Sequence, residues 1–205
     1  ELCVLSIDPK HQSERDNYKL LIGTIIPRPI AFVTSMTKNG TINGAPFSYF
    51  NIVSSNRPLI SLAIQRRHGE VKDTARNILD RGEFVVHIVD DEHVEKINTT
   101  AASLSPEESE IVAANLILVE STDIAVPGIK ESKVRFECKL ERALELGNEA
   151  GTTVDLLIGE IVRFHIAEEI YEAGKINAER LKAVSRLAGS DYAHIGTIFS
   201  LERPR

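Results

Sequence analysis

Hydrophobic and polar residues alternate along the segment "IAFVTSM", which begins at Ile30. Even-numbered residues from Ile30 to Met36 share one face and the odd-numbered residues share the other, which is the period of a β-strand. The pair Asn39-Gly40 follows and favours a tight hairpin in which both turn residues take positive φ. We therefore expect a strand, a two-residue turn and a second strand that begins at Thr41.

Other apolar runs predict further strands. The almost continuous run "PLISLAIQ" favours a position inside a sheet, and "TVDLLIGEIVRFHIA" is long enough to need a bend at Gly159. The remaining expected strands are "FNIVSS", "EFVVHIV", "LILVE", "KVRFECKLERALEL" and the closing strand "TIFSLERP".

Four segments carry helix signals: "SERDNYKLLIG", "KDTARNILDRG", "EHVEKINTTAASL" and "SPEESEIVAAN". Glycines are expected to end the first two, and capping residues to begin three of them. The expected cap positions are Ser13, Gly23, Asp73 or Thr74, Gly82, and a capping box from Ser105 to Glu108. Residues 177–196 are expected to mix a short helix with a loop that contains "SRLAGSDY".

Strands outnumber helices in this reading, and tight hairpins imply antiparallel pairing. The predicted fold is mainly β with inserted helices, arranged as a closed or nearly closed barrel, because closure removes exposed strand edges. No linker-like block, internal repeat or low-complexity run divides the chain. We therefore expect residues 1–205 to form one domain.

Composition narrows the functional classes. The 205 residues are 42% hydrophobic, as in a globular domain, and the net charge of −6 argues against nucleic acid or an anionic membrane as partner. No apolar run reaches the roughly 18 residues of a membrane span, and no signal peptide is recognised. Cys3 and Cys138 form no CxxC or zinc pattern, and the histidines show no metal-binding spacing. A cytoplasmic protein without bound metal is expected.

The segment "NGAPFSYFN", residues 43–51, combines small and polar residues. Gly44 and Ala45 leave the backbone accessible to a flat ligand, and Pro46 interrupts the hydrogen-bond ladder. Ser48 and Asn51 add polar side chains. The segment is therefore a candidate ligand wall, and the alternative is a bulged strand whose polar residues face solvent.

The segment Lys72-Asp73-Thr74 opens a predicted helix. A helix N-terminus presents unpaired N–H groups and partial positive charge, which suits a phosphate, and the alternative is an ordinary cap beside a surface lysine. Arg28 lies between two prolines and is a stiffly presented cation. No GxSxG or post-strand GxGxxG occurs, so neither nucleophilic catalysis nor a Rossmann site is indicated.

The segments occur in the order that is typical of one family. "PRPIAFVTS", "NGTINGAPFSYFN", "RPLISLAI", "KDTARNI", "GEFVVHIV", "FECKLERAL", "GEIVRFHI", "SRLAGSDY" and "LERP" together resemble the flavin reductase-like family, whose members share the FMN-binding split β-barrel. The resemblance spans roughly residues 25 to 204. Ala188 stands where relatives usually carry a second glycine of "RLGGxxY".

This resemblance implies an antiparallel split β-barrel that binds FMN as its cofactor. Lys72 and Thr74 would hold the phosphate, Asp73 would lie at the helix cap, and Arg28 and Arg186 would lie near the phosphate or the ring edge. The residues that would contact the flavin or its ribityl phosphate are Thr34, Ser35, Ala45, Pro46, Phe47, Ser48, Tyr49 and Asn51, with Tyr192 at the border of the ring.

The resemblance further implies a homodimer with FMN near the subunit interface, and an oxidoreductase that takes electrons from NAD(P)H. No catalytic side chain is expected, because the cofactor carries the chemistry. One alternative is a non-enzymatic flavoprotein that stores FMN or carries electrons for a redox partner protein. A β-barrel that binds another small anion is the third hypothesis.

Overall fold

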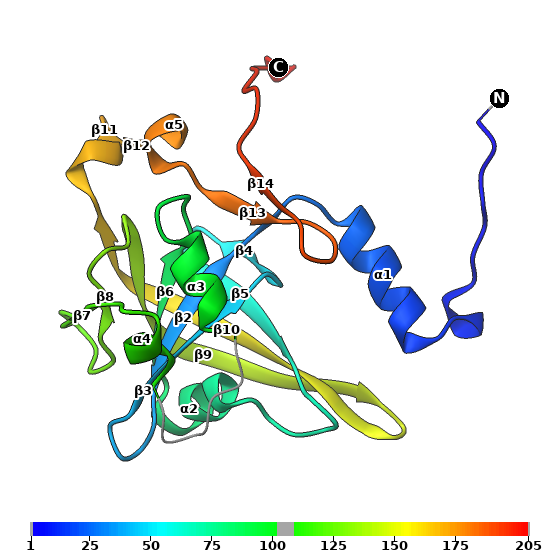
Figure 1. The fold of residues 1–205 in the computed structure, drawn as a ribbon, viewed down its shortest axis with the longest axis horizontal. Helices are drawn as coiled ribbons and strands as arrows, with labels where there is room; N and C mark the ends of the chain where they lie inside the picture. Colours follow the sequence, from blue (N-terminus) through cyan, green and yellow to red (C-terminus); the bar gives the residue numbers. More distant parts are fainter. Residues whose placement is uncertain (1, 102–108, 205) are drawn as a thin grey trace.

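Seven antiparallel strands form the main sheet in the computed structural model, which describes residues 2–101 and 109–204 (Figure 1). Their spatial order is β3-β2-β6-β9-β10-β5-β4. The strands are β2 (Ala31–Met36), β3 (Ile42–Phe47), β4 (Phe50–Ser54), β5 (Leu59–Gln65), β6 (Glu83–Ile88), β9 (Val134–Asn148) and β10 (Gly151–Ile166). The predicted antiparallel, mainly β fold is confirmed.

Smaller elements surround this sheet. β1 (Arg28–Pro29), β13 (Val184–Arg186) and β14 (Tyr192–His194) form a three-stranded sheet, and β7 (Leu118–Val119) with β8 (Gly128–Ile129) and β11 (Tyr171–Glu172) with β12 (Lys175–Ile176) form two pairs. The α-helices are α1 (Glu14–Thr24), α2 (Asp73–Arg81), α3 (Val94–Thr99), α4 (Glu110–Ala113) and α5 (Ala178–Leu181). Two short 3₁₀ helices, η1 (Pro9–His11) and η2 (Glu168–Ile170), complete the list.

The hairpin predicted around Asn39-Gly40 joins β2 to β3. The N–H of Thr37 donates to the carbonyl of Thr41 at 2.9 Å, and the N–H of Gly40 donates to the carbonyl of Thr37 at 3.1 Å. Within this three-residue loop only Gly40 has a positive φ, of 92°. The predicted two-residue turn is therefore wrong, because a longer loop that ends in a left-handed glycine closes the hairpin.

One cluster of buried side chains joins strands from both ends of the sheet order. Val33 of β2, Leu62 of β5, Phe84 of β6 and Leu157 of β10 belong to it, together with Ile78 of α2. Because strands so far apart in the order share one core, the sheet curls around it as a barrel wall does. The pairing of β9 with β10 shifts register between Ile158 and Gly159, at the position where a bend is predicted.

β2 is buried on both faces. Ala31 and Val33 face the barrel core, whereas Ile30 and Phe32 join a second cluster with Val89 and other residues from α3, α4 and β8. The predicted alternation is correct in direction. Its polar residues are nevertheless enclosed by protein rather than exposed, which matters for the candidate site below.

α2 packs on the barrel core and ends at Gly82, which has a left-handed φ of 72°, as predicted. Its N-cap is Lys72 rather than the predicted Asp73 or Thr74, since those two residues already belong to the helix. Ser13 caps α1 as expected, with its Oγ accepting from the N–H of Asp16. Gly23 does not end α1, because the helix continues to Thr24.

Other expectations need correction. Residues 195–204 form no strand, so the closing strand "TIFSLERP" is wrong: this segment leaves the body after β14 and is exposed (Figure 1). Residues 185–192 form the turn and flanks of the β13–β14 hairpin rather than a plain loop. The strand "LILVE" shrinks to two residues, and the Ser105–Glu108 capping box lies outside the described residues.

Buried Glu137 of β9 fastens the segment that precedes β8. Its carboxylate accepts from the N–H groups of Thr122 at 2.6 Å and Asp123 at 2.7 Å, and it also bonds His165 Nε2. Burial alone would raise the pKa of Glu137, but these three bonds outweigh burial and hold the pKa below its ordinary value.

The longest described helix, α1, has 11 residues, whereas a bilayer span needs roughly 20. None of the helices described in residues 2–101 and 109–204 could therefore cross a membrane. In the same residues, no group of three or more His, Cys, Asp and Glu side chains is placed to hold a metal ion.

Candidate functional site

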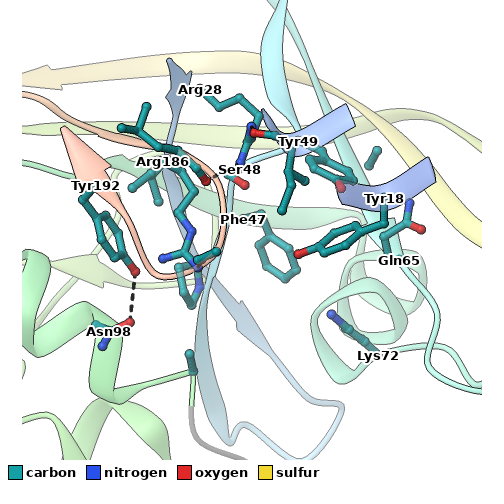
Figure 2. Close-up of a pocket in the computed structure, with 17 residues that line it drawn as sticks. Tyr18, Arg28, Phe47, Ser48, Tyr49, Gln65, Lys72, Asn98, Arg186 and Tyr192 are labelled. Carbon is teal, nitrogen blue, oxygen red and sulfur yellow. Dashed lines mark hydrogen bonds between the residues drawn. The ribbon is translucent and has the colours of Figure 1, made fainter. Parts of the chain in front are cut away.

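A surface cleft of about 450 Å³ lies between the end of β3, the C-terminal half of α1, the start of α2 and the β13–β14 hairpin (Figure 2). Rings from Tyr18, Phe47, Tyr49 and Tyr192 contribute to its lining. Polar side chains converge on it from six elements or their flanks. The labelled polar and charged residues of the cleft are Arg28, Ser48, Gln65, Lys72, Asn98 and Arg186.

A second space of about 510 Å³, the α2 hollow, adjoins the cleft at the first turn of α2. The two spaces share Pro46, Phe47, Lys72 and Ala101 in their linings. The rest of the lining comes from β3, from the loop before α2 and its first turn, and from Thr100 and Glu110. An elongated ligand could therefore place an aromatic part in the cleft and a polar end at α2.

The first turn of α2 has the chemistry of an anion site. No side chain caps the helix within the described part of the chain, and Arg76 is the first residue whose N–H bonds back, to the carbonyl of Lys72 at 3.0 Å. The N–H groups of Asp73, Thr74 and Ala75 precede that bond, and a helix leaves such groups without internal partners. They supply donors and partial positive charge toward an anion in the hollow.

Lys72 lies where the two spaces meet. Its Nζ is 5.9 Å from the centroid of the Phe47 ring, and among the described residues no carboxylate lies within 4.0 Å of it. Its side chain is exposed overall, yet neighbouring protein desolvates the ammonium and Arg67 repels it. Both effects lower the pKa of Lys72.

Asn43 is a candidate that the sequence analysis did not single out. Its residue is 5% exposed, it lines the α2 hollow, and its Oδ1 has no hydrogen-bond partner among the described residues. A buried amide oxygen without a partner costs free energy, so a ligand hydroxyl or amine that donates to it would relieve that cost. Burial of a polar residue inside an edge strand cannot be read from the sequence.

Arg28 lines the cleft but is already engaged. Its Nη1 donates to the carbonyls of Ile22 at 2.9 Å and Ile25 at 2.6 Å, and its Nη2 donates to the carbonyl of Leu187 at 2.9 Å. The side chain is 7% exposed. Arg28 thus lies at the cleft while contacting the main chain through three N–H groups, and its implied place near the phosphate or the ring edge stays a prediction.

The β13–β14 hairpin supplies the opposite wall. The Arg186 guanidinium lies over the Tyr192 ring, 4.5 Å from its centroid, and donates to the carbonyl of Gly189 at 2.6 Å. The Tyr192 hydroxyl donates to Asn98 Oδ1 at 3.0 Å, which ties the hairpin to α3 (Figure 2). Arg186 and Tyr192 thus reach the cleft as expected.

Thr34 and Ser35 do not reach either space. Thr34 Oγ1 donates to the carbonyl of Pro127 at 2.7 Å, and Ser35 Oγ accepts from Asn77 Nδ2 at 3.1 Å. Both residues are fully buried, because β2 has protein on both faces. Their side chains therefore join β2 to neighbouring segments and not to a ligand in the cleft.

The remaining predicted residues divide between the spaces. Pro46 and Phe47 line both, Ser48 and Tyr49 line the cleft, and Ala45, Asp73 and Thr74 line the α2 hollow. Asn51 lies elsewhere: it lines an apolar groove of about 430 Å³ along β4, and its Oδ1 accepts from the N–H of Ile52.

Gly44 uses its missing side chain for packing. A Cβ built on it would lie 2.4 Å from Ile111 Cδ1 and 2.6 Å from Phe32 Cζ, so the space beside its Cα is filled by the second core cluster. Its backbone still lines the α2 hollow. The expected approach of a ligand past a missing side chain therefore does not apply at Gly44.

Comparison with protein families gives the same interpretation as the geometry of the cleft and the α2 hollow. The model of the flavin reductase like domain matches residues 22–181, more than half of the chain. The chain belongs to the flavin reductase-like family. It is accordingly a flavin-dependent oxidoreductase of the flavin reductase type.

Solved structures support this placement. Nitrilotriacetate monooxygenase component B from Bacillus cereus is 59% identical, with a TM-score of 0.96 over 98% of this chain and 100% of that chain. The 2-nitrobenzoate 2-nitroreductase NbaA from Pseudomonas fluorescens is 30% identical, with a TM-score of 0.88 over 98% of this chain and 96% of that chain.

A split-barrel domain protein from Shewanella frigidimarina is 22% identical, with a TM-score of 0.82 over 95% of this chain and 96% of that chain. At this identity the likeness concerns the fold alone. It confirms the split β-barrel predicted from the sequence.

Proposed function

We propose that this protein is an NAD(P)H-dependent flavin reductase that holds FMN across the cleft and the α2 hollow. One observation carries the proposal: a cleft lined by aromatic rings opens, at Lys72 and Phe47, onto an uncapped helix start. A flat ring joined through a polyhydroxyl chain to a phosphate has the same order of chemical groups.

The donor set fits this cofactor. The N–H groups at the start of α2 and the Lys72 ammonium suit the phosphate, and the orphan Asn43 Oδ1 suits a ribityl hydroxyl. The carboxylates of Glu70, Asp73 and Glu110 also line the hollow. Asp73 is paired with Arg76, and Arg67 adds positive charge beside Lys72. The helix start favours FMN because it offers a place for one terminal phosphate.

Each residue then has a binding role. Backbone and side chains from Ala45 to Tyr49 border the ring and its chain, while Arg186 and Tyr192 border the ring from the hairpin. When bound, the flavin supplies the redox chemistry, accepting a hydride and passing electrons on. The protein's part is to orient the ring and shield it, so we propose no catalytic side chain.

In this proposal the reduced flavin passes its electrons to a partner protein component. Its support is the 59% identity to component B of a monooxygenase, over nearly the whole length of both chains. A cytoplasmic location and a single domain over residues 1–205 stay predictions from the sequence.

We also propose a homodimer. β4 is an edge strand, and the adjoining groove is lined by apolar side chains that include Phe50, Leu59 and Phe164. The segment before α1 and the segment after β14 hold further exposed apolar residues, among them Leu5, which is 82% exposed, and Phe199, which is 77% exposed. Light scattering should give twice the chain mass, and Ile52→Lys in the groove should shift the protein toward monomer.

The activity test combines purified protein, FMN and either NADH or NADPH, with the loss of nicotinamide absorbance as readout. Turnover with at least one nucleotide is expected, together with tighter binding of FMN than of FAD by flavin fluorescence. Absence of turnover with both nucleotides would contradict the reductase. Reduction by a partner protein alone would instead indicate an electron carrier.

A further inference from the structure

Two walls of the cleft come from segments that are distant in sequence. α1 contributes Tyr18 and Ile22, and the β13–β14 hairpin contributes Arg186, Leu187 and Tyr192. Ile22 is the only buried residue of α1, and the helix stands away from the barrel (Figure 1). α1 therefore needs a specific fastening to keep its wall in place.

Arg28 makes that fastening. Its guanidinium reaches two carbonyls at the end of α1, those of Ile22 and Ile25, and one carbonyl of the hairpin, that of Leu187. The backbone of Arg28 also pairs with Arg186 in the β1–β13 ladder. One buried side chain thus joins both walls, and its own strand fixes the hairpin beside it.

The charge on Arg28 has no carboxylate partner within 4.0 Å among the described residues, and the three carbonyl oxygens stabilise it instead. Carbonyl dipoles that converge on a guanidinium leave few N–H groups free for a ligand. Nε is buried and has no partner in the described part of the chain. Three of its five N–H groups are therefore engaged by protein carbonyls, and these three contacts join the two walls.

We propose that Arg28 is a positioning residue, which sets the distance between α1 and the β13–β14 hairpin and thereby the width of the cleft. In this proposal Arg28 contacts the two segments that border the flavin, and it does not contact the flavin phosphate. The expected effect on ligands rests on the proposed flavin site. The three Arg28 contacts with Ile22, Ile25 and Leu187, which we call the clamp, can be tested without any flavin.

The flavin-independent test is hydrogen exchange measured by mass spectrometry on Arg28→Met, with Arg163→Met as matched control. Arg163 also makes two hydrogen bonds, to Asp123, but lies outside the cleft lining. Arg28→Met should accelerate exchange in residues 14–26 and 184–194 and leave the β9–β10 barrel strands unchanged. Uniform acceleration everywhere, or none in these two segments, would overturn the clamp.

The ligand test compares FMN, riboflavin and lumiflavin by fluorescence titration. Arg28→Met should weaken all three by a similar factor, about tenfold for the loss of a buried charged group from the wall. A loss confined to FMN would make Arg28 a phosphate ligand and overturn the proposal.

Arg28→Lys keeps the charge but cannot reach both segments with one ammonium, so an intermediate loss for all three flavins is expected. This variant also serves if Arg28→Met does not fold. Failure of the wild type to bind any flavin would sink the proposed function, whereas the hydrogen-exchange result would still decide the clamp.

Discussion

Lys72 Nζ lies 5.9 Å from the centroid of the Phe47 ring, and both residues line both the cleft and the α2 hollow. A cation and an aromatic face therefore meet where the proposed ring and phosphate ends of the ligand join. Lys72→Met should cost about 1.5–3 kcal/mol of FMN affinity, the range for a charge-assisted bond. Riboflavin, which has no phosphate, should lose much less, and equal losses in paired titrations would exclude a phosphate contact.

The same lysine predicts a pH dependence. Its pKa lies below the ordinary 10.5 because of desolvation and repulsion by Arg67, so the ammonium loses its proton at a lower pH than an exposed lysine does. FMN affinity should therefore fall as pH rises through that lowered pKa, while riboflavin affinity stays level. Lys72→Arg should abolish the alkaline fall, since arginine keeps its charge.

Asn43 should show opposite effects on affinity and stability. Asn43→Leu removes a buried oxygen that has no partner among the described residues, so thermal unfolding should be unchanged or slightly raised. Binding of FMN and riboflavin should weaken by about 0.5–1.5 kcal/mol, and lumiflavin, which has no ribityl chain, should be unaffected.

Asn77 provides the control for Asn43. Its Nδ2 donates to Ser35 at 3.1 Å, so Asn77→Leu removes a satisfied buried bond and should lower stability. Matching losses of stability in the two variants would show that Asn43 has a protein partner.

The lowered pKa of Glu137 predicts that the free energy of unfolding falls at acid pH, which we call the acid limb. Its pKa is lowered in the folded state, so its contribution is complete above the unfolded value of about 4.5 and is lost as pH falls through the lower folded pKa. Glu137→Gln should cost about 1–3 kcal/mol at neutral pH and flatten this limb. Denaturant unfolding across the acid range measures both effects, and parallel curves for the two proteins would refute them.

Gly44 should not tolerate a methyl group. Gly44→Ala would bring Cβ within 2.4 Å of Ile111 and 2.6 Å of Phe32, so a loss of about 1–3 kcal/mol in unfolding free energy is expected. At Gly196 a Cβ would meet nothing within 4 Å, so Gly196→Ala should leave the melting temperature unchanged. Similar behaviour of the two variants would count against the packing explanation.

Periodicity predicted the strands and helices well, because apolar alternation and capping residues act locally. β2 shows its limit: alternation gives the faces of a strand but not whether protein covers both. The family resemblance implied that Thr34 and Ser35 contact the flavin, and alternation could not show that protein encloses both side chains.

Roles that depend on distant partners were also beyond the sequence. Arg28 looked like a presented cation, yet its partners include a carbonyl 159 positions away. Asn98 and Gln65 reach the cleft from α3 and β5 without any local signal. Lys72 and Thr74 could be placed at the start of α2 because a helix start has a recognisable pattern in the chain itself.

The Arg28 contacts have a consequence for how the protein can change. All three acceptors are main-chain oxygens, which every amino acid supplies, so substitutions at positions 22, 25 and 187 leave the acceptor chemistry intact. Substitutions can therefore alter the side chains around the cleft, and with them the choice of second reactant. The Arg28 contacts that set the distance between α1 and the β13–β14 hairpin would be kept.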